Sequence, residues 1–113
     1  MAFQTSDAHA AHELRPVRVA ALSAGVFEEA RTLAAELPGW RVLESDEPSG
    51  RIVCSKQNGL LRGSARITIS VESPPGIPST TVQVSSISSG GLFHPDRQNV
   101  AQFVRPFQRR VCL

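Results

Sequence analysis

The 113-residue sequence has little of what membrane-embedded or disulfide-stabilised proteins require. No apolar run approaches the roughly 20 residues of a membrane-spanning helix. The N-terminal segment also lacks the basic start and apolar core of a signal peptide. The two cysteines, Cys54 and Cys112, are too few for a disulfide framework or a metal signature. We therefore expect a soluble protein, cytoplasmic by default, or exported or envelope-associated if the chain is a fragment lacking its signal.

Residues that bind metals, cofactors or nucleic acids are also scarce. The three histidines, two of them near the N-terminus, do not form the convergent set that a metal ion needs. No glycine-rich phosphate motif is present. Lys56 is the only lysine, and the arginines are scattered among acidic residues, whereas nucleic-acid-binding proteins concentrate their positive charge. We expect no metal, no cofactor and no nucleic acid partner.

The hydrophobic pattern is that of an ordinary globular domain. Alternating apolar and polar residues predict strands, at 17–22, 40–45, 51–57, 64–72 and 80–88. Residues 24–37 have an apolar face at helical spacing, with Ser23 as the expected N-cap. A second helix is predicted after Pro95, and Pro106 should kink or end it near Arg105.

The predicted order is strand, helix, four strands, helix. Short turns between the four strands favour an antiparallel meander. We therefore predict an α+β fold, a single mainly antiparallel sheet with both helices packed on one face. The other face stays polar, as plain solvent surface or as a binding surface. Residues 1–16 are expected to form a mobile tail and residues 17–113 one domain. Ile87 breaks the alternation of the last strand, so we expect a bulge or strand end near Ser85 and Ser86.

Three short motifs punctuate this pattern: the PGW sequence that ends the first helix, the GRI sequence that begins a strand, and polar residues that open the last helix, at Pro38, Gly39, Trp40, Gly50, Arg51, Ile52, Asp96 and Asn99. Together they resemble a bacterial family catalogued as domain of unknown function fourteen ninety-nine. The chain departs from the family where Arg62-Gly63 replaces an Asp-Asp pair and where serines stand without neighbouring arginines. The resemblance implies a fold and a bacterial origin, and it implies no established activity.

The loop before the last helix is one candidate site. It consists of Ser88, Ser89, Gly90 and Gly91, with His94 close behind. Backbone N–H groups in such a loop can hold an anion, although the following Asp96 opposes one. Ser, His and Asp also lie close enough in sequence to suggest a small hydrolase-like enzyme, although no GxSxG elbow is present. We identify no catalytic residue from the sequence. The alternative to both roles is a loop that only connects the strand to the helix.

Apolar side chains in predicted turns form the second candidate site. Leu60, Leu61 and Phe93 are expected in loops, where apolar residues often cover a pocket or meet a partner. This pattern favours a non-catalytic module that binds a small apolar ligand or a protein partner, and a homodimer is one form of such binding. The hydrolase is the alternative, and the sequence leaves the question of catalysis open.

Overall fold

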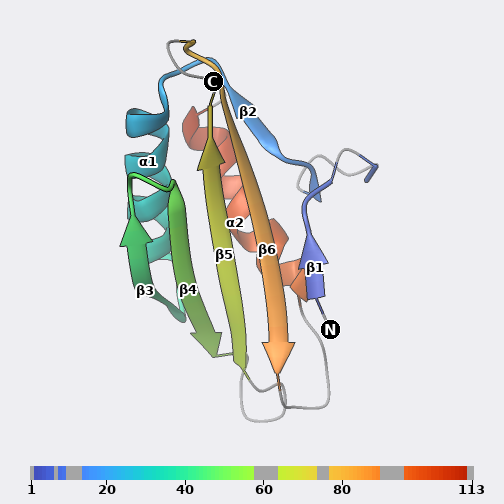
Figure 1. Ribbon diagram of the computed structural model, residues 1–113. Helices are drawn as coiled ribbons and strands as arrows, with labels where there is room; N and C mark the ends of the chain where they lie inside the picture. Colours follow the sequence, from blue (N-terminus) through green and yellow to red (C-terminus); the bar gives the residue numbers. More distant parts are fainter. Residues whose placement is uncertain are drawn as a thin grey trace.

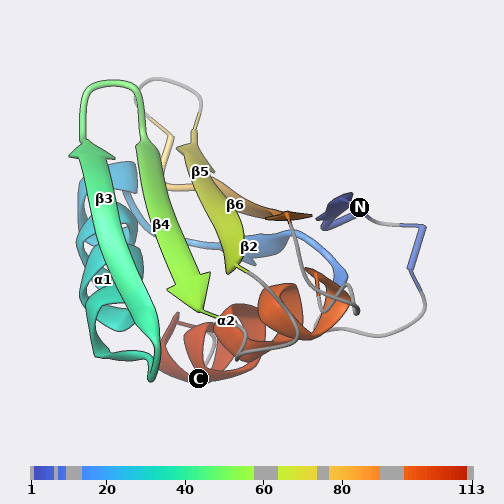
Figure 2. The ribbon, with the colours of Figure 1, turned by 90° about the horizontal axis from the view of Figure 1, so that it is seen from below.

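A computed structural model describes residues 2–6, 8–9, 14–57, 64–73, 77–89 and 96–111. One antiparallel sheet is covered on one face by two helices, which confirms the predicted α+β architecture (Figures 1 and 2). The elements are β1 Ala2–Gln4, β2 Val17–Val19, α1 Ser23–Glu36, β3 Trp40–Asp46, β4 Arg51–Gln57, β5 Ser64–Glu72, β6 Thr80–Ser89 and α2 Asp96–Val111. In these ranges neither helix is long and apolar enough to cross a membrane.

The sheet has the strand order β1-β6-β5-β4-β3, and β2 also pairs with β6. All of these pairs are antiparallel. The four consecutive strands β3 to β6 form the predicted meander, because each is joined to the next by a short connection. α1 lies behind the β3 side of the sheet, and α2 lies behind β5 and β6 (Figure 1).

The N-terminal segment contributes a strand where the sequence predicted a mobile tail. β1 pairs with the end of β6, with Phe3 opposite Ser86. The Thr5 N–H donates to the Val84 carbonyl at 2.9 Å, and Thr5 Oγ1 accepts from the Val84 N–H at 3.1 Å. The prediction fails here because a three-residue strand is too short to show an alternating pattern.

The core lies between the inner face of the sheet and the two helices. The inward side chains of the strands are mostly β-branched, as suits a pleated surface. The buried core residues include Ile52, Cys54, Ile67, Ile69, Val82 and Val84 from the sheet, Val26, Phe27, Ala30, Leu33 and Ala34 from α1, and Val100, Phe103, Val104 and Phe107 from α2. Buried apolar area of this kind is the main stabilising term of a small domain.

The predicted bulge or strand end near Ser85 and Ser86 is wrong. β6 continues to Ser89 and the β5–β6 register runs without interruption, whereas a register shift lies in β3 between Val42 and Glu44. β6 keeps strict alternation by turning Ser86 inward and leaving Ile87 57% exposed. The polar residue faces inward because α2 presents a hydrogen-bonding partner at that position, as described below.

The start of α1 and the end of α2 differ from the sequence prediction. α1 begins at Ser23, with Leu22 at the N-cap and no side-chain capping bond. α2 continues through Pro106 to Val111, so of the two predicted alternatives, a kink or an end near Arg105, the end is wrong. A proline in a helix removes one backbone hydrogen bond, and the apolar face of α2 on the sheet offsets that loss.

The turn between β3 and β4 is held against β5 by Gly50. Its φ is +70°, in the left-handed region that favours glycine. The Val71 N–H donates to the Gly50 carbonyl at 2.7 Å. A Cβ on Gly50 would lie 2.1 Å from the Val71 carbonyl oxygen, so no other residue fits this approach. The close contact brings the turn to the N-terminal end of α1, where the turn forms one wall of a cleft.

Candidate functional site

The structure describes only part of the two candidate sites that the sequence predicted. Ser88 and Ser89 lie at the end of β6, and Ser88 is buried. The other predicted residues lie outside the described ranges: Leu60, Leu61, Gly90, Gly91, Phe93 and His94. Their proposed roles in binding therefore stay predictions.

Ser86 and Ser88 meet Asp96 beneath the first turn of α2. Ser86 Oγ donates to Asp96 Oδ1 at 2.7 Å, and Ser88 Oγ donates to the same oxygen at 2.6 Å. Both serines point inward because they are two residues apart on one strand. The Asp96 side chain is 3% exposed. A carboxylate at a helix N-terminus is electrostatically favourable, so these bonds fasten the start of α2 to β6.

A chain of hydrogen bonds continues from this clamp along the inner face of the sheet. Asn99 Nδ2 donates to Ser86 Oγ at 3.3 Å, and Lys56 Nζ donates to Asn99 Oδ1 at 2.9 Å. Lys56 Nζ also donates to Gln102 Oε1, which accepts from Trp40 Nε1 at 3.1 Å. The network therefore connects α2 with β6, β4 and β3, and buried polar groups linked in this way define one relative position for the elements.

The network does not resemble a catalytic triad in the part of the chain that is described. A serine nucleophile passes its proton to a general base, usually an imidazole that a carboxylate orients. Here the Ser88 hydroxyl donates directly to the Asp96 carboxylate, and Ser88 is only 6% exposed. The hydrolase hypothesis would need the His94 imidazole, which is outside the described residues. Labelling of Ser88 by a fluorophosphonate reagent would be the result that supports it.

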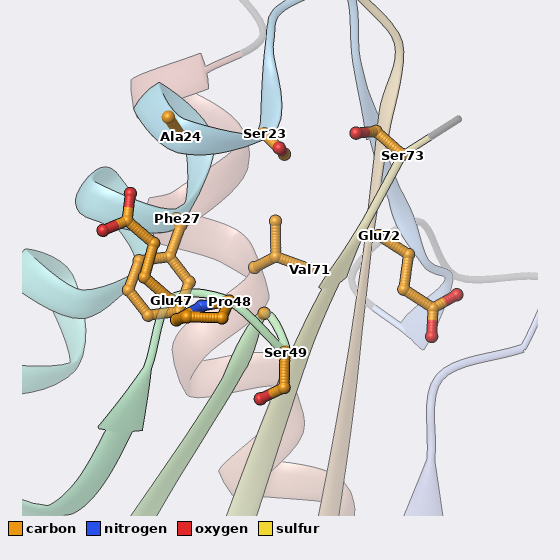
Figure 3. A pocket seen from close by; sticks show the side chains of 10 residues that line it. Ser23, Ala24, Phe27, Glu47, Pro48, Ser49, Val71, Glu72 and Ser73 are labelled. Atoms are coloured by element: carbon orange, nitrogen blue, oxygen red, sulfur yellow. The ribbon is translucent and has the colours of Figure 1, made fainter. Parts of the chain in front are cut away.

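A cleft opens at the N-terminal end of α1, between the helix, the β3–β4 turn and the end of β5 (Figure 3). We call it the α1 cleft. Its volume is about 310 Å³, close to the lower limit for ligand pockets. The lining residues are Ser23, Ala24, Phe27, Glu47, Pro48, Ser49, Gly50, Val71, Glu72 and Ser73. It is thus the opening at one end of the layer between α1 and the sheet.

The α1 cleft combines an apolar interior with a polar margin. Phe27 and Val71 are buried core residues at its base, and Val71 stands in the middle of the hollow in Figure 3. Serine hydroxyls and the carboxylate of Glu47 lie at the margin, whereas the Glu72 carboxylate points away from the hollow (Figure 3). Apolar walls with a few polar groups at the edge are typical of sites that bind small groups. The arrangement offers burial for an apolar group and acceptors for a donor or a cation.

Sequence reasoning missed the α1 cleft. Its residues come from a helix start, a turn and a strand end that are distant in the chain, so no local motif marks it. Pro48 and Gly50 indicated a turn correctly, but only the contact of Gly50 with Val71 shows that the turn leans over β5. The apolar pocket between the layers that the sequence favoured stays a prediction.

In the described residues, the outer face of β5 and β6 carries the polar side chains that were predicted, with Ile87 exposed beside them. Outward side chains of β5 and β6 line a shallow hollow of about 230 Å³, which includes Thr68, Ser70, Gln83 and Ser85. A neighbouring hollow of about 450 Å³ is lined by Gln4, Thr5, Ser6, Pro16, Arg18 and Gln83. Neither lining contains an aromatic ring on which a base or a sugar could stack. This face therefore has fewer features of a binding site than the α1 cleft.

Cys54 points into the core from β4. Its thiol is fully buried, and burial raises its pKa to about 11 from an ordinary value of 9.0. Because the thiolate is the reactive form, this side chain is chemically inert at neutral pH. Within the described ranges, no group of three or more His, Cys, Asp or Glu residues could hold a metal ion.

Comparison with known proteins identifies no family for this chain. No protein-family model matches it, and no curated protein matches it. A solution NMR structure of a protein from Thermobifida fusca, a structural genomics target, is 14% identical over 96% of this chain and 93% of that chain, with a TM-score of 0.48. The resemblance to the domain of unknown function noted above stays a prediction.

Proposed function

We propose that the protein is a non-catalytic binding module and that its binding site is the α1 cleft. The observation that carries the proposal is the opening of the apolar layer between α1 and the sheet to solvent over Phe27 and Val71. An apolar group that enters this space loses contact with water without having to displace a core side chain. The size of the cleft fits one side chain or a small molecule.

The start of α1 adds hydrogen-bond donors to the site. No side-chain hydrogen bond caps this helix, and no acidic residue stands in its first turn. The first backbone N–H groups of a helix have no partner within the helix. These N–H groups are donors that lie beside the serine hydroxyls at the margin. The cleft therefore offers both hydrogen-bond donors and acceptors around an apolar base.

Blocking the cleft with a large side chain tests the proposal. Ala24 lines the cleft and is exposed, so Ala24→Trp should fill its mouth without disturbing the core. Ala35→Trp is the matched control, since Ala35 is exposed on the same helix and is not among the lining residues. The readout is the backbone-amide NMR spectrum during titration with a set of small alkyl and aryl fragments, neutral and charged.

We expect fragments to shift the amides of Ser23, Ser49 and Val71 in the natural protein and in Ala35→Trp, and not in Ala24→Trp. Shifts that persist in Ala24→Trp would place binding elsewhere and refute the proposal. A complete lack of shifts at these three amides in the natural protein would refute it as well.

A further inference from the structure

The outer face of the sheet carries an unpaired arginine near its centre. Arg66 lies on β5, the middle strand of the sheet order, and it is exposed. Its side chain is on the outer face, because its neighbours in the strand, Ala65 and Ile67, are buried in the core. In the part of the chain that the structure describes, the Arg66 guanidinium forms neither an ion pair nor a hydrogen bond. Its donors are therefore available to a ligand.

Among the described residues, no acidic side chain adjoins Arg66. The strand register places Ser55 of β4 and Ile87 of β6 directly opposite it. Neutral residues occupy the remaining adjacent positions of this face: Val53, Gln57, Ser64, Thr68, Ser85 and Ser89. Cβ atoms at such positions lie within roughly 8 Å of each other. The acidic residues of the outer face are on the edge strand β3 and at the end of β5: Glu44, Asp46 and Glu72. The positive charge at the centre thus attracts an anion.

Hydroxyl groups from three strands lie around this arginine. They belong to half-buried residues at adjacent outward positions: Ser55, Ser64, Thr68 and Ser85. The guanidinium fork pairs with two oxygens of a carboxylate or a phosphate. A carboxylate has no further oxygen, whereas a phosphate has a third one that a hydroxyl can reach as a donor. The donor set therefore favours a phosphate group.

Ile87 adds an apolar surface beside the charge. Its side chain is 57% exposed, directly opposite Arg66 in the register. An organic group that covered it would remove apolar surface from water, which is favourable. Inorganic phosphate cannot make this contact, but the ester of an apolar alcohol can.

We propose that the outer face around Arg66 is a second binding site, which takes a phosphate monoester with an apolar organic group. The phosphate accepts hydrogen bonds from the Arg66 guanidinium and from the hydroxyl of Ser55 or one of its neighbours, and the organic group lies on Ile87. The site faces away from both helices (Figure 2). It is therefore separate from the α1 cleft and does not depend on the function proposed for that cleft.

The test is a titration of the full chain, at constant ionic strength, with n-butyl phosphate, inorganic phosphate and n-pentanoate. Backbone-amide NMR shifts report the binding. Arg66→Gln removes the guanidinium, and Ile87→Ser removes the apolar surface. Arg51→Gln is the matched control, because Arg51 is exposed on the same face and lies opposite Asp46 in the register, so both arginine variants lose one positive charge.

We expect n-butyl phosphate to shift the amides of Ser55, Arg66 and Ile87 and to bind more tightly than the other two anions. Arg66→Gln should weaken its binding about tenfold, because charge-assisted hydrogen bonds are lost. Arg51→Gln should change it by less than about twofold, since salt screens a distant exposed charge. Ile87→Ser should reduce the affinity for n-butyl phosphate to that for inorganic phosphate.

Three results would overturn the inference: no saturable shifts at these amides, equal weakening by the two arginine variants, or equal binding of n-pentanoate. Vesicles of phosphatidylcholine and phosphatidic acid present the same phosphate on a lipid surface. Vesicle binding that requires Arg66, without saturable binding of n-butyl phosphate, would replace the soluble ligand with a membrane. The α1 cleft is read at the amides of Ser23, Ser49 and Val71, so either proposal can fail while the other stands.

Discussion

The two helices cover the same face of the sheet by different chemistry. Every buried residue of α1 is apolar, whereas the buried residues of α2 include Asp96 and Asn99 as well as its phenylalanines and valines. The buried contacts of α1 are thus apolar, and its polar links to α2 are the ion pairs of Glu29 and Glu36 with Arg110 at the surface. The α2 layer adds a line of hydrogen bonds from Ser88 to Trp40.

The two helices therefore differ in how firmly their positions on the sheet are fixed. Hydrophobic contact is non-directional, so an apolar helix face tolerates small shifts along the sheet. Hydrogen bonds in a buried network have strict geometry, and a shift of α2 would leave several polar groups without partners. The open cleft lies at the start of α1, just after the hydrogen bond from Thr80 Oγ1 to the Ala21 carbonyl. We infer that the sheet and α2 form the fixed frame, and that the first turn of α1, which has no side-chain cap, is freer to adapt to a ligand.

The largest effect should come from removing an aromatic ring on the α2 side. Phe103 is fully buried, and its ring lies 6.0 Å from that of Trp40 and 5.2 Å from that of Phe107. Phe103→Ala should cost about 4–5 kcal/mol, because the cavity is enclosed. Phe27→Ala should cost about 1–2 kcal/mol less, since its space opens into the α1 cleft. Urea denaturation measures both, and an equal or larger loss for Phe27 would show that the α1 layer is closed.

A smaller loss of stability should follow from breaking the hydrogen-bond network of α2 with a side chain of similar size. Asn99→Leu removes an acceptor from Lys56 and a donor from Ser86. We expect a loss of about 1–3 kcal/mol, because buried partners are left unsatisfied. Gln98→Leu, at an exposed position of the same helix, should change the free energy of unfolding by about 0.5 kcal/mol or less. If Asn99→Leu and Gln98→Leu change the free energy of unfolding equally, the network does not stabilise the packing of α2 on the sheet.

Elements with a long pattern could be predicted from the sequence. β4 (Arg51–Gln57) and β5 (Ser64–Glu72) have the predicted bounds, and β5 alternates regularly between buried and more exposed residues. The errors lie where tertiary contacts overrule the local pattern. Ser86 faces inward because Asp96, ten residues later, accepts its hydrogen bond, and no rule of alternation contains that information. The α1 cleft could not be predicted either, because it depends on how closely the turn at Gly50 approaches Val71.

A pH-dependent effect concerns Cys54, which shares the inward face of β4 with Lys56 and is buried in the hydrophobic core. Its pKa is about 11 in the folded protein and 9.0 in an exposed thiol. Above pH 9 the unfolded chain therefore binds fewer protons at this site than the folded one. Stability must then fall as pH rises toward 11, by at most about 1.4 kcal/mol per pH unit, while below pH 9 this group contributes no slope.

Cys54→Ala separates this contribution from those of the other titrating groups, which both proteins share. Its cavity lowers the free energy of unfolding by a constant amount, but the difference between the two proteins should shrink between pH 9 and pH 11. Denaturation at a series of pH values measures that difference. A difference that stays constant would mean that water reaches the Cys54 thiol, and that the interface beneath the helices is not dry at β4.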